Sequence, residues 1–279
     1  MPTNDKDLQQ LLQKVFEERG FDFRQYKMSM LKRRMERRLT VTRSESYIDY
    51  AKLLDSHPEE YKKLFDDLTI NVSRFFRNPL TFELIYKVVL PDMIEYKQIS
   101  MDNMIRIWSA GCANGEEPYS VAILLAELLG KQLKNYNITI YATDIDTDAL
   151  NDAKTGIYSG ESVAEVKKGL LDKYFHFDGN YRIKEHVKEL VDFSYHDLTS
   201  EKFIAPTKSV FVNFDLILCR NVLIYFSRPL QDKVFNNFTH DLNKKGYLIL
   251  GEAETLPDDF KNDFVCGNNL SKIYQKIKV

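Results

Sequence analysis

The sequence predicts an α/β protein: a doubly wound parallel sheet with a small antiparallel β insertion, preceded by an all-helical N-terminal domain. Residues 1–72 carry apolar residues at helical spacing and almost no strand signal. Between 104 and 279, apolar runs of strand length alternate with helical patterns, as is typical of a parallel sheet covered by helices. An Asp-Gly-Asn turn between two short β-like stretches predicts the insertion.

The composition is that of an ordinary globular protein, with 279 residues, 44% hydrophobic residues and 29% charged residues. No apolar run approaches the ~18 residues of a membrane span, and the first ten residues lack the apolar core of a secretion signal. We therefore expect a cytoplasmic protein without direct membrane insertion. The three cysteines are widely spaced and odd in number, which predicts reduced thiols and no metal site.

Helical periodicity predicts the elements before the sheet. The predicted helices cover residues 8–16, 28–39, 46–54 and 59–70. Asn78-Pro79 then breaks the pattern before an amphipathic helix over 81–96, and we assign 73–103 to a linker and this helix.

The second domain, over 104–279, is expected to alternate strands and helices. Strands are predicted at 105–110, 138–145, 214–219 and 247–251, and helices at 117–133, 147–156 and 231–243. The insertion is placed at about 158–197, with its hairpin turn at Asp178-Gly179-Asn180. The tail can supply a closing hairpin with Asn268-Asn269 near its turn.

The segment WSAGCANGEEPYS follows the first predicted strand, where doubly wound folds place their ligand. Gly111 and Gly115 allow the backbone to approach a ligand, although a tight turn alone would also require them. Glu116 and Glu117 follow at the helix start, where carboxylates complement the helix dipole but would repel a pyrophosphate. For Glu116 we favour this structural role in the first turn.

Asp144 ends the next predicted strand, at the position where such folds bind a ribose. Together with Glu117 it favours a nucleoside that carries a cationic group and no phosphate. S-adenosylmethionine is a nucleoside of this kind. NAD is the alternative cofactor, but GCANGEE departs from the GxGxxG pattern.

The chain resembles the chemotaxis receptor methyltransferases of the CheR family over nearly its whole length. The resemblance rests on five segments, NVSRFFRNP at 71–79, WSAGCANGEEPYS at 108–120, ATDIDTDAL at 142–150, SYHDL at 194–198 and LCRNVLIYF at 218–226. It implies a Rossmann-like bacterial enzyme of signal transduction. Such an enzyme transfers a methyl group from S-adenosylmethionine to glutamate side chains of methyl-accepting chemotaxis proteins, with S-adenosylhomocysteine as product, and can be recruited to membrane receptor arrays.

Motif position also implies individual site residues. The implied cofactor contacts are Asn71, Ser73, Arg77, Glu117, Asp144, Asp197, Leu198, Cys219, Arg220 and Asn221, to which the glycine turn adds Gly111. Arg77 and Tyr225 match the positions near the transferred methyl group. The hairpin HFDGNYRI is shorter than in members that dock on a receptor's carboxyl-terminal pentapeptide, so we expect no such tether.

The chemistry makes few demands on the protein, because a glutamate carboxylate is already ionised at neutral pH and needs no general base. The five histidines form no catalytic cluster in the sequence. Arg77 can hold a carboxylate through two parallel hydrogen bonds, or form a surface ion pair. Tyr225 can donate one hydrogen bond to the carboxylate, or be a core aromatic residue.

A basic helix is predicted in the N-terminal domain, because residues 24–43 contain eight basic residues and one acid, Glu36. On a helix, one stripe would hold Lys27, Arg33, Arg34, Arg37 and Arg38. A solvated charged face is the ordinary interpretation of such a run. The scarcity of acids favours a polyanionic partner instead, and the resemblance favours an acidic receptor helix, which makes the stripe a substrate-docking surface.

Two other functions are weighed against receptor methylation. A nucleic-acid methyltransferase is suggested by the basic helix, but the chain lacks an NPPY-like motif or paired catalytic cysteines, and we expect no nucleic-acid partner. A non-catalytic signalling module that binds S-adenosylmethionine or another nucleotide is the second alternative.

Overall fold

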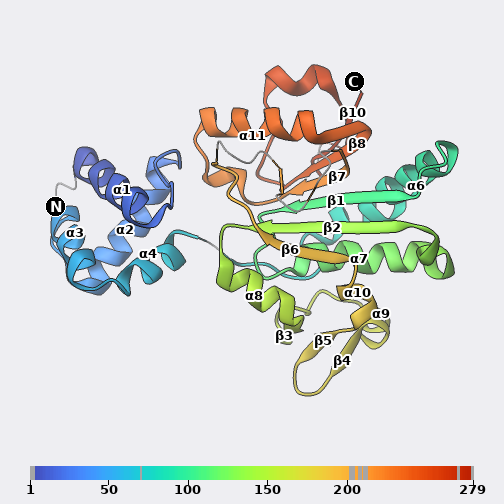
Figure 1. Ribbon diagram of the computed structural model, residues 1–279, viewed down its shortest axis with the longest axis horizontal. Coiled ribbons are helices and arrows are strands. Elements are labelled where there is room, and N and C mark those ends of the chain that lie inside the picture. Colours follow the sequence, from blue (N-terminus) through green and yellow to red (C-terminus); the bar gives the residue numbers. More distant parts are fainter. Residues whose placement is uncertain are drawn as a thin grey trace. The chain divides into compact units, whose positions relative to one another are not determined.

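The computed structural model describes residues 4–69, 71–200, 205–206, 209, 213–268 and 271–277 (Figure 1). The chain divides into two compact units. The first comprises residues 1–70 and 225–233, and the second comprises residues 71–224 and 234–279. The domain boundaries expected at residues 72 and 103 remain predictions.

The first unit is helical, as predicted. Its helices are α1 (Asp5–Arg19), α2 (Met28–Thr42), α3 (Tyr47–Ser56) and α4 (Glu60–Leu68), together with the first residues of α11 (Arg228–Asp241). Ser46 caps the start of α3, since its hydroxyl accepts a hydrogen bond of 3.1 Å from the Asp49 amide. Leu8, Leu31 and other apolar residues at helical spacing are fully buried and form the core of this unit.

The segment before the sheet contains one irregularity that the sequence pattern did not show. The helix predicted over 81–96 consists of α5 (Pro79–Leu84), a π-helical turn η1 (Ile85–Val89) and α6 (Leu90–Ile99). Pro91 has no amide hydrogen for the carbonyl four residues earlier, and a π turn accommodates the missing bond.

The second unit is built on a seven-stranded sheet with the order β6-β2-β1-β7-β8-β10-β9. The strands are β1 (Met104–Ala110), β2 (Asn137–Asp144), β6 (Val191–Tyr195), β7 (Phe214–Cys219), β8 (Leu242–Leu250), β9 (Phe264–Asn268) and β10 (Ile273–Lys276). Neighbours from β6 to β8 pair in parallel, and β10 pairs antiparallel with both β8 and β9. The predicted closing hairpin is therefore present, although Asn269 lies outside the described residues.

Besides α11, which connects β7 to β8, further helical segments lie between the strands along the chain. They are α7 (Glu116–Leu129), η2 (Gly130–Asn135), α8 (Thr147–Thr155), η3 (Leu223–Tyr225) and η4 (Asp258–Asp263). Since α7 follows β1 and α8 follows β2, the loops that begin these helices leave the same edge of the sheet. That edge holds most of the predicted site.

The small antiparallel sheet is also confirmed. Its order is β3 (Ile157–Tyr158), β5 (Tyr181–Ile183) and β4 (Phe175–Phe177), flanked by α9 (Lys168–Tyr174) and α10 (Glu185–Lys188). Gly179 has a φ of 97° in the predicted turn between β4 and β5. The predicted extent of 158–197 is wrong at its end, because β6 pairs in parallel with β2 and belongs to the main sheet.

No helix in the described parts of the chain has the length and apolar character needed to cross a bilayer.

Candidate functional site

The loop after β1 is shaped by two glycines with positive φ, 78° at Gly111 and 88° at Gly115. A Cβ atom on Gly111 would lie 2.4 Å from a methyl group of Val222, and one on Gly115 would lie 2.9 Å from the Ala153 side chain. Both glycines are therefore required by the turn and by close packing. The backbone of this loop lies directly against the loop after β7.

Asp144 lies at the carboxyl end of β2 and binds the glycine loop. Its carboxylate accepts hydrogen bonds from the amides of Ala113 (2.8 Å) and Asp146 (3.0 Å). Burial raises the pKa of this carboxyl, while the two amides oppose the rise. The carboxyl group therefore lies at the edge of the sheet where the sequence predicts a ribose contact.

The two glutamates at the start of α7 have different surroundings. Glu117 accepts hydrogen bonds from the Ser109 hydroxyl (2.8 Å) and the Arg220 guanidinium (3.2 Å), at the edge of the sheet. Glu116 is only 2% exposed, and burial raises its pKa. Hydrogen bonds from Ser73 and Ser162 partly oppose this rise. Glu116 is thus a buried residue of the first helical turn, as the sequence favoured.

The segment that carries Arg77 is fixed on both sides. The Phe75 amide donates to the Ser162 carbonyl (3.0 Å), and the Phe76 amide donates to the Ser120 hydroxyl (3.0 Å). Phe76 and Asn78 have φ values of 56° and 63°, which are uncommon for residues with side chains. Such strained positions persist only where the surroundings impose them, and they concentrate at functional sites.

Arg220 holds the strained turn at Arg77 and Asn78 in place. One nitrogen of its buried guanidinium donates to the Arg77 carbonyl (2.8 Å) and to the Asn78 side-chain oxygen (2.9 Å). Another nitrogen pairs with Glu117, and the guanidinium lies 5.2 Å from the centre of the Phe82 ring. Arg220 was predicted to contact the cofactor, but these contacts connect β7, α7 and the turn that carries Arg77.

The Arg77 side chain itself is partly exposed. Its guanidinium donates one hydrogen bond to the Val72 carbonyl at 2.9 Å. Among the described residues no carboxylate pairs with it. The alternative of a surface ion pair therefore has no support in the described parts of the chain, and the guanidinium retains donors for a ligand.

Two further predicted cofactor contacts bind protein carboxylates. The Asn71 side-chain amide donates a hydrogen bond of 2.6 Å to the Asp146 carboxylate, and the Ser73 side chain forms a hydrogen bond with Glu116. These contacts fasten the segment before Arg77 to the starts of α8 and α7. Their predicted contact with the cofactor is untested.

The remaining predicted residues lie in the loops after β6 and β7. Asp197 accepts a hydrogen bond from the Thr199 amide (2.8 Å), next to the half-buried Leu198. Cys219 is fully buried, and burial raises the pKa of its thiol, so it is unreactive packing beneath the site. The side-chain oxygen of Asn221 is buried and has no hydrogen-bond partner within the described residues.

Sequence reasoning missed Glu254, which lies after β8. Its carboxylate is 4% exposed and accepts hydrogen bonds from the Gly251, Asn221, Val222 and Ile224 amides. The signal was its position in GEAE, just beyond a strand end, where loops of this fold reach the ligand.

Tyr225 belongs to the first unit. Its carbonyl accepts a hydrogen bond of 2.8 Å from the Lys27 amide, next to a bridge between Tyr26 and Phe226. The role predicted for its phenol is untested.

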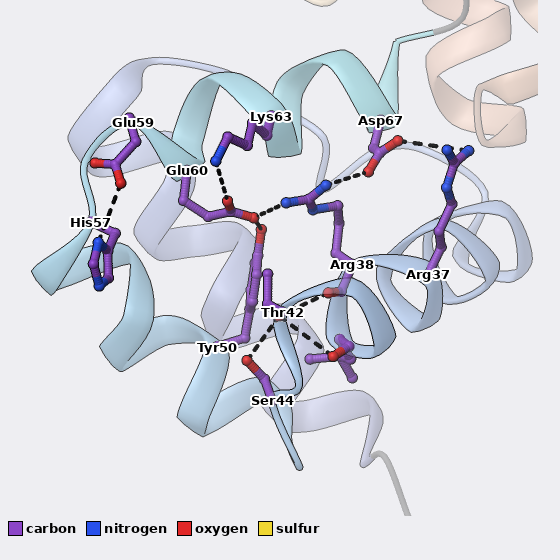
Figure 2. Close-up of polar contacts among 11 residues, drawn as sticks. Arg37, Arg38, Thr42, Ser44, Tyr50, His57, Glu59, Glu60, Lys63 and Asp67 are labelled. Atoms are coloured by element: carbon purple, nitrogen blue, oxygen red, sulfur yellow. Dashed lines mark hydrogen bonds and ion pairs between the residues drawn. The ribbon is translucent and has the colours of Figure 1, made fainter.

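The basic helix α2 differs from its prediction at Arg38. Figure 2 shows the Arg38 guanidinium between Glu60 and Asp67, with the Tyr50 hydroxyl also donating to Glu60 at 2.9 Å. Arg38 is only 7% exposed, so its prediction as a docking residue is wrong. The periodicity placed it on the basic stripe correctly, but α4 packs on that side of α2.

The rest of the basic run is partly neutralised. Arg24 pairs with Asp22 and Lys32 pairs with Asp5. The Arg37 side chain is 66% exposed and lies 3.8 Å from Asp67. The four other residues of the predicted stripe retain some exposure, and they are Lys27, Arg33, Arg34 and Arg37.

Two family models match the chain. "CheR methyltransferase, SAM binding domain" matches residues 71–270, and "CheR methyltransferase, all-alpha domain" matches residues 6–69. A chemotaxis protein methyltransferase of Borreliella burgdorferi is 33% identical, with 90% of this chain and 88% of the relative aligned. Chemotaxis protein methyltransferase 2 of Vibrio cholerae is 31% identical, with 90% of this chain and 86% of the relative aligned. The Escherichia coli chemotaxis protein methyltransferase is 30% identical, with 91% of this chain and 86% of the relative aligned.

The edge of the sheet fits the cofactor named by the first model. Asp144 and Glu117 place two carboxyl groups at this edge, the second paired with Arg220, and the buried Asn221 oxygen and Arg220 Nε both have no partner within the described residues. A cationic nucleoside suits these carboxyl groups, whereas the pyrophosphate of NAD does not. The chain belongs to the CheR methyltransferase family and is an S-adenosylmethionine-dependent methyltransferase.

Proposed function

We propose that this enzyme is a protein-glutamate O-methyltransferase that modifies chemoreceptors. The observation that carries the proposal is the Arg77 guanidinium, which is partly exposed and has no carboxylate partner in the described residues. A glutamate side chain is the acceptor for which such a guanidinium is suited. The names of the curated relatives, chemotaxis protein methyltransferases, support chemoreceptors as the source of that glutamate.

The protein's contribution to the reaction is orientation. S-adenosylmethionine, when bound, supplies an electrophilic methyl group, and the products are a methyl ester and S-adenosylhomocysteine. The substrate carboxylate is ionised at neutral pH, so no residue has to remove a proton. Arg77 would hold this carboxylate in line with the methyl group, and Tyr225 would donate a further hydrogen bond to it.

We assign the cofactor contacts by the chemistry of each group. Asp144 is proposed to accept hydrogen bonds from the ribose, and Glu117 to face the methionyl portion. Asp197 and Leu198 would flank the adenine, and Asn221 would offer its side-chain oxygen, which no described residue binds. Asn71 and Ser73 support this site through their contacts with Asp146 and Glu116.

Substrate docking is assigned to the helical domain. Lys27, Arg33, Arg34 and Arg37 would attract the glutamates of a receptor helix. Four of the eight cations in residues 24–43 are already paired with acids, namely Arg24, Lys32, Arg37 and Arg38. This lowers the charge excess on which the nucleic-acid alternative depended. The short β4–β5 hairpin supports docking without a pentapeptide tether, and cytoplasmic receptor domains as the substrate imply a cytoplasmic enzyme.

The test is transfer of labelled methyl from S-adenosylmethionine to a cytoplasmic chemoreceptor fragment, followed by mild base. We expect base to release the label as volatile methanol, as a carboxyl methyl ester would. A matched fragment with its candidate glutamates replaced by alanine should remain unlabelled. Label that resists base, or no label despite demonstrated S-adenosylhomocysteine binding, would contradict the proposal.

A further inference from the structure

The carboxylate of Glu254 is bound by four backbone amides. One oxygen accepts from Val222 (2.9 Å) and Ile224 (3.2 Å), and the other accepts from Asn221 (3.0 Å) and Gly251 (2.6 Å). Since β7 and β8 are parallel neighbours, their following loops leave the sheet side by side. Glu254 therefore joins the loop after β8 to the loop after β7.

Several groups of the site depend on the backbone that this carboxylate holds. Asn221 has a φ of 62°, and its buried side-chain oxygen has no hydrogen-bond partner in the part of the chain that the structure describes. Arg220 precedes it and binds the turn that carries Arg77. Val222 follows it and packs so closely on the glycine loop that a Cβ on Gly111 would meet it at 2.4 Å.

We propose that Glu254 is a positioning residue of the methyl-transfer site, which sets the backbone at 221–224 and thereby the cofactor-facing Asn221 and the packing of Val222 on the glycine loop. Within the described residues its hydrogen bonds are all with backbone amides, so it acts through these residues. The reaction it serves rests on the proposed function, but its effect on cofactor affinity does not.

A carboxylate is the side-chain group that suits the position between these four backbone amides. Its two oxygens can accept all four amides, and each hydrogen bond to a charged group is stronger than a neutral one. A glutamine keeps the shape but replaces one oxygen with an amino group, so two backbone donors would face a donor. Glutamine therefore disrupts the amide contacts without removing side-chain volume.

The decisive experiment compares Glu254→Gln with Glu252→Gln by calorimetric titration of the full chain with S-adenosylhomocysteine. Glu252 is exposed and lies two residues away, which makes it a matched control. We expect Kd to rise about 10- to 100-fold for Glu254→Gln, the size expected for lost buried hydrogen bonds to a charged group. Glu252→Gln should retain the wild-type Kd.

A second variant, Gly251→Ala, keeps the carboxylate but disturbs the same contacts. Its Cβ would lie 2.8 Å from both a Glu254 oxygen and the Asn221 nitrogen. We expect weaker S-adenosylhomocysteine binding here also, and this variant decides the matter if Glu254→Gln fails to fold. Wild-type Kd in the folded variants, even with a lower unfolding temperature, would overturn the proposal, since instability alone does not change the Kd of folded protein. Wild-type enzyme that binds S-adenosylhomocysteine but leaves receptor fragments unlabelled would refute only the glutamate reaction.

Discussion

Arg38 and Arg220 are both buried arginines, one in each unit, and their partners differ in kind. Arg38 bonds two carboxylates, Glu60 and Asp67, which lie on the regular helix α4. Arg220 bonds one carboxylate and two neutral oxygens, and the neutral oxygens belong to the Arg77–Asn78 turn. The first contacts hold helices together, whereas the second hold a strained loop at the predicted site.

This difference separates stability from function. An arginine that joins regular elements contributes mainly to the free energy of unfolding, because those elements have no other arrangement to adopt. An arginine that joins loops sets the geometry on which orientation of the substrate depends. Four variants test this contrast between the two arginines and their surroundings, and their expected effects decrease from the first to the last.

Arg38→Ala is expected to lower the free energy of unfolding by about 3–5 kcal/mol, because it removes the buried cation from Glu60 and leaves only the exposed Lys63, 3.6 Å away. The Glu60 side chain is only 6% exposed, so water cannot replace the guanidinium. Chemical denaturation measures the loss. Arg33→Ala, at an exposed position on the same helix, should change stability by less than about 0.5 kcal/mol. Unchanged stability of Arg38→Ala would show that the buried pair contributes nothing net.

Arg220→Lys is expected to lower kcat about 100-fold, because one ammonium group cannot hold Glu117 and both oxygens of the Arg77 turn. Methyl transfer to a receptor fragment at saturating cofactor measures this loss. Arg228→Lys is the control, since Arg228 forms an exposed ion pair with Asp232. Wild-type kcat in Arg220→Lys would remove the distinction between the two buried arginines.

Reversing the charge of Arg33 and Arg37 together should raise KM for the receptor fragment about 2- to 10-fold, the range expected for two exposed charges. The increase should shrink at high salt, because exposed charges are screened. Kd for S-adenosylhomocysteine should not change. Lys131→Glu, an exposed reversal in the second unit, is the control, and an equal rise in KM there would argue against docking on α2.

Glu116→Gln should stabilise the protein at neutral pH, because burial disfavours the charged form of Glu116 and the variant carries no charge there. Burial raises the pKa of Glu116, so the folded state binds its proton more tightly than the unfolded state does. Wild-type stability should therefore fall as pH rises from the ordinary glutamate pKa through the raised one, and the penalty persists above it. Unfolding measured across pH 4–8 should show the variant's advantage appear over this window, while Glu165→Gln, at an exposed position, shows none.

The elements were predictable where periodicity is strong and local. The helices of the first unit, the alternation in the second and the Asp-Gly hairpin all follow from such patterns. Val191–Tyr195 was assigned to the small sheet because it follows that hairpin along the chain, and only its pairing with β2 reveals its place. The π turn before Pro91 likewise depends on a missing amide rather than on the apolar pattern.

The site residues were predictable as positions at strand ends, but less so as contacts. A helical projection shows which residues share a face and not which element packs on it, and so Arg38 was misassigned. The contacts of Glu254 could not be predicted from the sequence, because its partners are backbone amides and any residue type supplies these. Arg220 was found by motif, yet its contacts with Arg77 and Asn78 required the folded structure.

The central claim is that Arg77 orients the substrate carboxylate, and Arg77→Ala tests it most directly. The measurement pairs kcat for methyl ester formation on a receptor fragment with Kd for S-adenosylhomocysteine, on the same preparation. We predict that kcat falls about 100-fold or more, the loss expected when an orienting group is removed, while Kd changes only a few-fold. Equal losses in kcat and in cofactor affinity would contradict this role and make Arg77 a cofactor-binding residue.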